Sequence, residues 1–412
     1  MKHMMKNHRP MTPRLFSTRT FLALAILLAP SSVAPAQSKK RPAAKTSYSA
    51  ASASRDHHVA AAFAPVFYQG LGDNARADYI TNFDFDGDWR GDNNWANADD
   101  KRFKMRAYVY YAVAETPTHF FVHYAVFHPR DYKGGGAGGA ILSEAIREGV
   151  RRGGRYDPTG LSSEAVLAHE NDMEGCLVVA AKSGEDLSPA LIVEYLSRAR
   201  IVYVETLGHD RFQKYAAEGA GASNFKRFAT EDRRPVLYVE PKGHGVSAYD
   251  DKEQGARPIG AARYERLGRT RNMLAYYYAG GAGDPALSGF GGEVNYDLLP
   301  LYTTLWPRAR RGANETFGVA RDFGVLSASA SANGKALSRR FKLGKLGSAF
   351  RGKVGAPNAA RPPWGWFDRT ERGAPAGSWF FDPAATVKRD FKAGEDFSLA
   401  YTHAPFIGVF RR

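Results

Sequence analysis

Short strand-like segments separated by turn residues constrain the fold of this chain more than any other feature. The segments are rich in Val, Tyr and Phe, and clusters of Gly, Pro and Asp lie between them, a pattern typical of a β-sandwich or a barrel. We expect seven strands, at residues 61–68, 106–114, 118–127, 176–181, 201–206, 235–240 and 397–401. Helices are expected only at residues 140–151 and 188–200. The sequence therefore predicts a mainly β fold.

A cluster of potential metal ligands precedes one of these strands. His169, Asp172 and Glu174 form an H-x-x-D-x-E pattern before the apolar segment that begins at Cys176. Alternate residues of a strand share a face, so Asp172 and Glu174 point the same way, whereas His169 needs a bend or bulge to join them. The pattern suits a hard divalent cation at a loop that runs into a strand. It also suits solvated polar residues at a strand end.

A fourth potential ligand lies at the exit of an earlier strand. Pro129 is expected to stop the aromatic segment at residues 120–128, which leaves Asp131 just beyond it. Three carboxylates and one imidazole favour Mg²⁺ or Ca²⁺, ahead of Mn²⁺, over zinc, which draws on more nitrogen or sulfur ligands.

These two motifs resemble the paired signature of the necrosis- and ethylene-inducing (NPP-type) proteins, in which a strand ending in F-P-K-D precedes a G-H-R-H-D-W-E heptapeptide. Other segments resemble the related vacuolar protein sorting-associated protein sixty-two family. They are FAPVFY at 63–68, PVLYVEPKGH at 235–244, PPWGW at 362–366 and GSWF at 377–380. Together the resemblance covers most of residues 60 to 385.

The resemblance implies an antiparallel β-sandwich with a few flanking helices and long loops, and a divalent cation held at one edge. Carried over residue by residue, the metal ligands are Asp131, His169, Asp172 and Glu174. His244 is implied as a neighbour of these ligands.

The chain departs from the heptapeptide at several positions. Met173 replaces the family's tryptophan, Glu170 and Asn171 replace its Arg-His pair, and Ala168 stands where the family has glycine. These positions are tied to the cytolytic branch. The resemblance therefore implies the fold and the metal site rather than toxicity.

The N-terminal residues have the features of a secretory signal peptide. Residues 1–36 combine a basic start, an apolar core at 21–28 and small residues at 34–36. Residues 37–58, rich in Ala, Ser and Lys, predict a disordered linker. Residues 59–412 are ample for a single β-sandwich domain. No later segment reaches the roughly 18 apolar residues of a membrane span, so we expect a secreted or periplasmic monomer.

Basic residues are concentrated in residues 308–361. This stretch holds twelve Lys and Arg against Glu315 and Asp322, in a chain of formal net charge +15. Its Gly, Ser and Ala content is typical of an inserted loop or pair of loops. It is either a solvated excursion or a contact for an anionic glycan or lipid, with peripheral attachment to a membrane. Nucleic acid is not expected, because no nucleic-acid motif accompanies the charge.

Two classes of function remain. In the first, a secreted metal-binding protein recognises a glycan or lipid head group at an anionic surface. The alternative is a metal-dependent hydrolase of a phosphoester or glycan, with Glu170 or His244 as the candidate base. Nucleophilic catalysis has little support, because the chain lacks a G-x-S-x-G motif and its single cysteine, Cys176, begins an apolar strand. A dinucleotide-binding fold is excluded by the missing glycine fingerprint.

Overall fold

The computed structural model divides the chain into two units, Met1–Thr46 and Ser47–Arg412, and the described residues all lie in the second. They are residues 49–72, 74–91, 93–131, 169–183, 192–208, 211–220, 224–254, 273–289, 291–309, 362–366, 368 and 377–406, with the backbone of strands between 320 and 347. The predicted signal peptide, most of the predicted linker and the predicted helix at 140–151 lie outside them. Among the described residues, no helix combines the length and apolar character needed to cross a membrane.

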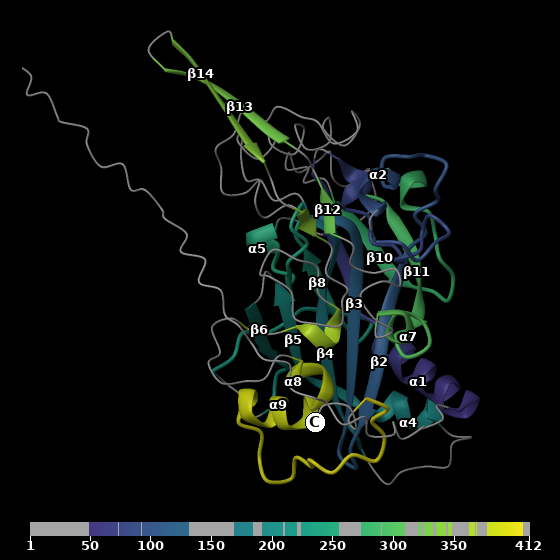
Figure 1. Ribbon diagram of the computed structural model, residues 1–412. Coiled ribbons are helices and arrows are strands. Elements are labelled where there is room, and N and C mark those ends of the chain that lie inside the picture. Colours follow the sequence, from purple (N-terminus) through teal and green to yellow (C-terminus); the bar gives the residue numbers. More distant parts are fainter. Residues whose placement is uncertain are drawn as a thin grey trace, which may run out of the picture. The chain divides into compact units, whose positions relative to one another are not determined.

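Eleven strands of the described residues form one large sheet (Figure 1). They are β1 (Val66–Gly70), β2 (Tyr108–Glu115), β3 (His119–Asp131), β4 (His169–Ala181), β5 (Arg200–Gly208), β6 (Arg211–Ala216), β7 (Thr230–Glu231), β8 (Arg234–Val239), β9 (Val246–Ala248), β10 (Met273–Tyr278) and β11 (Glu293–Pro300). Their order is β6-β5-β4-β3-β2-β11-β10-β1-β8-β7, with β9 paired to β8.

The sheet is mixed, which corrects the predicted antiparallel arrangement. The consecutive pairs β2–β3, β3–β4, β4–β5 and β5–β6 are antiparallel. The pairs β1–β8, β10–β11 and β11–β2 are instead parallel. Parallel neighbours need crossover connections, and β1 and β8 are indeed far apart in the sequence. The mainly β class is confirmed, whereas the sandwich is not.

The sheet curls until its two ends approach each other, like a nearly closed barrel. Gly208 at the end of β5 lies against Gly245 and Val246 at the start of β9. A Cβ atom built on Gly208 would fall 3.2 Å from the Cα of Gly245 and 3.2 Å from the amide nitrogen of Val246. Because β5 and β9 belong to opposite ends of the strand order, glycine at this position permits the close approach.

Helices cover parts of the sheet. The described α-helices are α1 (Ala50–Ala62), α2 (Asn94–Asn97), α4 (Ile192–Arg198), α5 (Asp251–Gln254), α7 (Leu305–Ala309), α8 (Ser378–Phe381) and α9 (Pro383–Phe391), and the described 3₁₀ helices are η1 (Ala75–Ala77), η5 (Pro285–Leu287) and η6 (Pro363–Gly365). The helix predicted at 188–200 corresponds to α4. Residues 397–401, predicted as a strand, form none.

Residues 50–58, predicted as the C-terminal part of a disordered linker, belong instead to helix α1. Ser49 caps the helix by accepting the amide hydrogen of Ser52, and Asp56 and Val59 are buried. The alanines in residues 50–58 favour the prediction of a disordered linker, but alanine also has the highest helix propensity of all residues. The helix also takes residues 61 and 62 from the predicted first strand, which begins only at Val66.

The core of the sheet is rich in aromatic residues, and two of its buried tyrosines bond to the backbone next to the sheet. The hydroxyl groups of Tyr124 and Tyr296 donate to the carbonyl oxygens of Ala60 and Pro65, at 2.6 and 2.7 Å. Such partners let large amphipathic rings be fully buried. These bonds also fix the end of α1 against the sheet.

Part of the basic stretch forms strands, which corrects the expectation of simple loops. Strands β13 (Val325–Ala332) and β14 (Lys335–Lys342) pair as an antiparallel hairpin, and β12 (Ala320–Asp322) pairs with β15 (Lys345–Gly347). Only the backbone of these strands belongs to the described part of the chain.

Candidate metal centre

The pairing of β3 with β4 brings the two predicted ligand motifs together. Asp131 lies opposite His169, and Asp172 lies opposite His128. The whole H-x-x-D-x-E pattern belongs to β4, which corrects the expected loop that runs into a strand. Pro129 does not stop β3, which continues to Asp131.

A bend lies within β4 at the step where the sequence requires one. Asn171, between His169 and Asp172, has a φ of 60°, a left-handed conformation that asparagine tolerates better than most residues. Its side chain holds the bend, because it accepts a hydrogen bond from Asn94 at 2.6 Å and donates one to the carbonyl of Gly91 at 2.7 Å. The backbone thus departs from a regular strand at the predicted step, and the convergence of His169 with Asp172 stays a prediction.

The predicted ligands that the structure describes are buried at this edge. Asp131 is 3% exposed, Asp172 5% and Glu174 7%. Asp172 and Glu174 are separated by one residue of an extended strand and so point to the same face. The side chains of His169 and Glu170 lie outside the described residues, so the complete set of four ligands stays a prediction.

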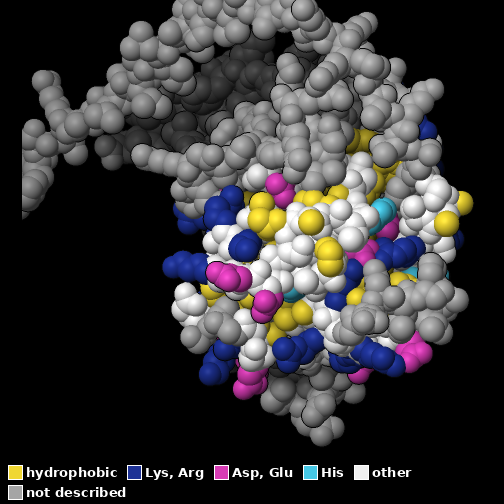
Figure 2. Space-filling view, turned by 90° about the horizontal axis from the view of Figure 1, so that it is seen from below, with side chains coloured by type: hydrophobic (Ala, Val, Ile, Leu, Met, Phe, Trp, Pro, Cys, Tyr) yellow, Lys and Arg dark blue, Asp and Glu magenta, His cyan; other side chains and the backbone are white. Residues whose placement is uncertain are grey.

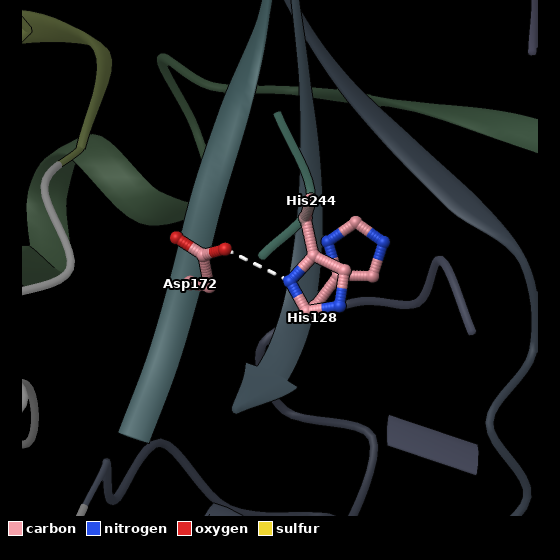
Figure 3. A group of neighbouring side chains, drawn as sticks. All are labelled: His128, Asp172 and His244. Atoms are coloured by element: carbon pink, nitrogen blue, oxygen red, sulfur yellow. Dashed lines mark hydrogen bonds and ion pairs between the residues drawn. The ribbon is translucent and has the colours of Figure 1, made fainter. Parts of the chain in front are cut away.

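His244 contacts Asp172 from the turn between β8 and β9. Its Nδ1 donates to Oδ2 of Asp172 at 2.8 Å, as Figure 3 shows. Its Nε2 donates to Oδ1 of Asp78 at 3.2 Å. The φ values of Lys242 and His244, 70° and 54°, turn the chain so that the ring enters the edge of the sheet.

The two carboxylates determine the charge of His244. Complete burial by itself lowers the pKa of this imidazole, but its hydrogen bonds to Asp172 and Asp78 outweigh burial and raise the pKa to about 10. His244 is therefore an imidazolium ion at neutral pH, with both N–H groups in use. In this form it is not a general base, which removes the main support for its candidate catalytic role.

His128 stacks on His244 and stays neutral. The ring centroids are 3.7 Å apart and the planes differ by 4°. Burial, and then the charge of His244, hold the pKa of His128 well below its ordinary value. Its Nε2 donates to Oε1 of Gln69 at 2.9 Å, since the amide group of Gln69 donates to the carbonyl of Gly70. Nδ1 of His128 thus keeps its lone pair, and it has no hydrogen-bond partner among the described residues.

His128, Asp172 and His244 form a buried group that could hold a metal ion, with ligand atoms within 4.8 Å of one another. The parallel rings restrict how they could do so. An imidazole binds a metal in the plane of its ring, about 2.1 Å from nitrogen, so an ion in the plane of one ring lies well outside the plane of the other. His244 is therefore a buried cation that holds Asp172 in place. Of the two imidazole rings, that of His128 is the better metal ligand, because its Nδ1 has no hydrogen-bond partner among the described residues.

Sequence reasoning missed two residues of this site. Asp78 follows η1 in a loop without any recognisable pattern, and it also accepts the amide hydrogens of Gly72 and Lys242, at 2.6 and 2.7 Å. For His128, the sequence indicates only that it belongs to a strand. The register that pairs Asp131 with His169 also places His128 opposite Asp172, and this pairing would have identified it.

Comparison with known proteins gives no family for this chain. No protein-family model matches it, and neither does any curated protein. One similar solved structure is described as a toxin fold for microbial attack and plant defense, with 13% identity over 46% of this chain and 66% of that chain and a TM-score of 0.24. NLPPya in complex with mannosamine is 13% identical over 47% of this chain and 68% of that chain, with a TM-score of 0.25. A non-toxic HaNLP3 protein is 15% identical over 35% and 47%, with a TM-score of 0.20.

The chain therefore spans between 47% and 68% of these three solved proteins. They are necrosis-inducing-like proteins, the group that the ligand motifs resemble. Likeness at these TM-scores assigns neither family nor function to this chain. The resemblance to the vacuolar protein sorting-associated family stays a prediction.

Proposed function

We propose that this protein uses a divalent cation, held where β3 ends and β4 begins, to recognise a glycan or lipid head group at an anionic surface. The pairing of Asp131 with His169, next to the pairing of His128 with Asp172, carries this proposal. It gathers ligand types from two motifs that are about forty residues apart in the sequence. We further propose that the protein is secreted and acts as a monomer.

The ligand set decides which metal suits the centre. Asp131, Asp172 and Glu174 supply carboxylate oxygens, and His169 and the free Nδ1 of His128 supply imidazole nitrogens. Carboxylates still outnumber imidazoles in this set, which favours Mg²⁺ or Ca²⁺. His244 already provides a positive charge to Asp172, and a cation at this edge would be a further partner for the carboxylates that line it. When bound, the cation would offer coordination positions to the hydroxyl or phosphate oxygens of the partner.

His244 supports this centre as a positioning residue. Carboxylates that bind metals are commonly held by a further hydrogen bond, which fixes their orientation. The 2.8 Å bond from His244 holds Oδ2 of Asp172 and so fixes the orientation of the carboxylate toward the cation. The bond of His244 to Asp78 holds the ring in place from the other side.

The hydrolase alternative gains nothing from the geometry. A base beside the metal needs a free lone pair, whereas both ring nitrogens of His244 donate hydrogen bonds, to Asp172 and Asp78. The side chain of Glu170, the other candidate base, lies outside the described residues. Recognition requires no such group. We therefore place binding ahead of hydrolysis.

Binding assays with and without metal test the proposal. Vesicles that contain phosphatidylserine, and a panel of immobilised acidic glycans, would be offered to the protein in calcium and in EDTA. We expect binding in calcium that falls at least tenfold in EDTA and in the Asp172→Asn variant. Glu194→Gln is the matched control, since Glu194 lies on the exposed surface of α4 and pairs with Arg198. Equal binding in calcium and EDTA would contradict a metal-bridged contact.

A further inference from the structure

A pocket of about 870 Å³ lies away from the candidate metal centre. It is formed by the end of α1, by α4, by β5 and β6, and by the turn between β7 and β8. Arg200, which lines it, pairs with Ala181, the last residue of β4. Asp172 lies nine residues earlier on β4, about 30 Å away at the rise of an extended chain. The pocket is therefore separate from the metal centre.

The floor of the pocket is apolar. Phe63, Leu196, Ala199, Ile201 and Phe228 contribute to it, and Val193 on α4 is 68% exposed beside it. Pockets of 300 to 1,000 Å³ with mostly apolar walls and a few polar groups are typical ligand sites.

Four arginines surround this floor: Arg200, Arg227, Arg233 and Arg234. Backbone carbonyls fix three of them without neutralising their charge. Arg227 donates to the carbonyl of Ala217 at 2.5 Å, Arg233 to that of Ala199 at 2.8 Å and Arg234 to that of Tyr278 at 3.2 Å.

No ion pair with a carboxylate of the described residues involves any of the four arginines. The carboxylates that line the pocket are those of Glu218 and Asp232, so four cationic groups face two anionic ones. Figure 2 shows the protein from below Figure 1, with Lys and Arg side chains and some Asp and Glu side chains around hydrophobic atoms.

We infer that this pocket binds a single-chain amphiphile with an anionic head, of the long-chain carboxylate class. The apolar floor would take the tail, and guanidinium groups match a carboxylate with paired N–H donors. A purely polar anion leaves the floor unused, and a neutral lipid leaves the arginines without a counter-charge. The apolar floor and the arginines together therefore favour an anionic amphiphile over a polar anion or a neutral lipid.

Calorimetric titration with dodecanoate below its micelle concentration tests the inference. Dodecyltrimethylammonium and dodecyl maltoside, which carry the same tail with a cationic or neutral head, serve as comparison probes. We expect dodecanoate to bind at least tenfold more tightly than either of them, and to bind equally well in EDTA. The EDTA arm separates this pocket from the metal centre, so the two proposals fail independently.

Two variants locate the site. Arg200→Gln combined with Arg233→Asn should weaken dodecanoate at least tenfold and leave dodecyl maltoside unchanged, and asparagine suits the left-handed φ of 66° at position 233. Ala62→Trp fills the pocket from the exposed end of α1 and should weaken every probe. Arg198→Gln, on α4 but outside the pocket, is the control. Equal affinity for the three head groups, or binding unaffected by either variant, would overturn the inference.

Discussion

The pairing of a buried imidazolium with two buried carboxylates is the strongest electrostatic feature of the candidate site at the scale of single residues. Removing one partner from such a group leaves a charge without compensation, at a cost of about 3–5 kcal/mol. We expect His244→Gln to lower the free energy of unfolding by about 3 kcal/mol or more, measured by urea denaturation in EDTA.

A second variant makes that result specific to the ion pair. Asp78 accepts the Nε2 hydrogen of His244, so Asp78→Asn removes one of the two carboxylates that His244 compensates. The double variant should then be more stable than the sum of the two single changes predicts. Strict additivity would show that His244 and Asp78 do not interact as ions.

The shifted pKa of a second buried histidine predicts how the free energy of unfolding depends on pH. His123 is buried and donates to the carbonyl of Trp379 at 2.8 Å. Burial lowers its pKa from 6.5 to about 4, so below pH 6.5 the unfolded chain binds a proton that the folded chain does not. The contribution of His123 to the free energy of unfolding is fully present above pH 6.5. It is lost as the pH falls toward 4, and the total loss is about 3 kcal/mol.

The His123→Gln variant isolates that loss, because glutamine keeps a donor for Trp379 but does not titrate. Urea denaturation of both proteins at pH 7 and pH 4.5 gives the change in their stability difference, from which the other titrating groups cancel. We expect the variant to gain about 2 kcal/mol relative to the parent on acidification. A difference that stays constant with pH would show that His123 titrates normally in the folded chain.

At the scale of elements, the β3–β4 pair carries the candidate site, and a glycine permits its spacing. A Cβ atom built on Gly175 would lie 1.9 Å from the carbonyl oxygen of Tyr124 on β3. We expect Gly175→Ala to destabilise the fold by at least about 2 kcal/mol, because the strands must separate to admit the methyl group. Gly281→Ala, where a Cβ would meet nothing within 4 Å, is the control. Equal melting temperatures for the two variants would contradict this register.

The same pair shows what sequence can predict. The aromatic, β-branched residues of β3 and the apolar end of β4 mark both strands, and the odd spacing of His169 and Asp172 predicts the bend found at Asn171. The length of β4 was underestimated, because His169, Asp172 and Glu174 have low strand propensity and their pairing with β3 overrides it. Asp78 could not be predicted at all, since only the tertiary fold brings its loop to His244.

At the scale of the whole molecule, long-range pairing decides the architecture. Local patterns indicate strands but not their neighbours, so the parallel pairing of β1 with β8 and of β11 with β2 could not be read from the sequence. Those pairings replace the expected antiparallel sandwich by one curled sheet. Charge, by contrast, is visible from composition alone.

The basic stretch at 308–361 makes a prediction about surface binding. Replacing Arg339, Arg340, Lys342 and Lys345 with glutamine should weaken binding to phosphatidylserine vesicles at least tenfold, and the parent's binding should fall steeply as salt shortens the Debye length from about 10 Å toward 3 Å. Melting temperatures of parent and variant should nearly agree, since we expect this stretch to be a solvated excursion and charges at a solvated surface contribute little to folding. Unchanged vesicle binding by the quadruple variant would remove the electrostatic role of this stretch.

The central claim is that a divalent cation binds where β3 meets β4, and thermal unfolding tests it most directly. The protein would be stripped of metal and melted with and without calcium at a hundredfold excess over its dissociation constant, beside the Asp131→Asn variant. We predict a gain of about 2.7 kcal/mol for the parent, seen as a raised melting temperature that EDTA reverses, and little or none for the variant. A parent whose melting temperature is the same in calcium, magnesium and EDTA would contradict the account.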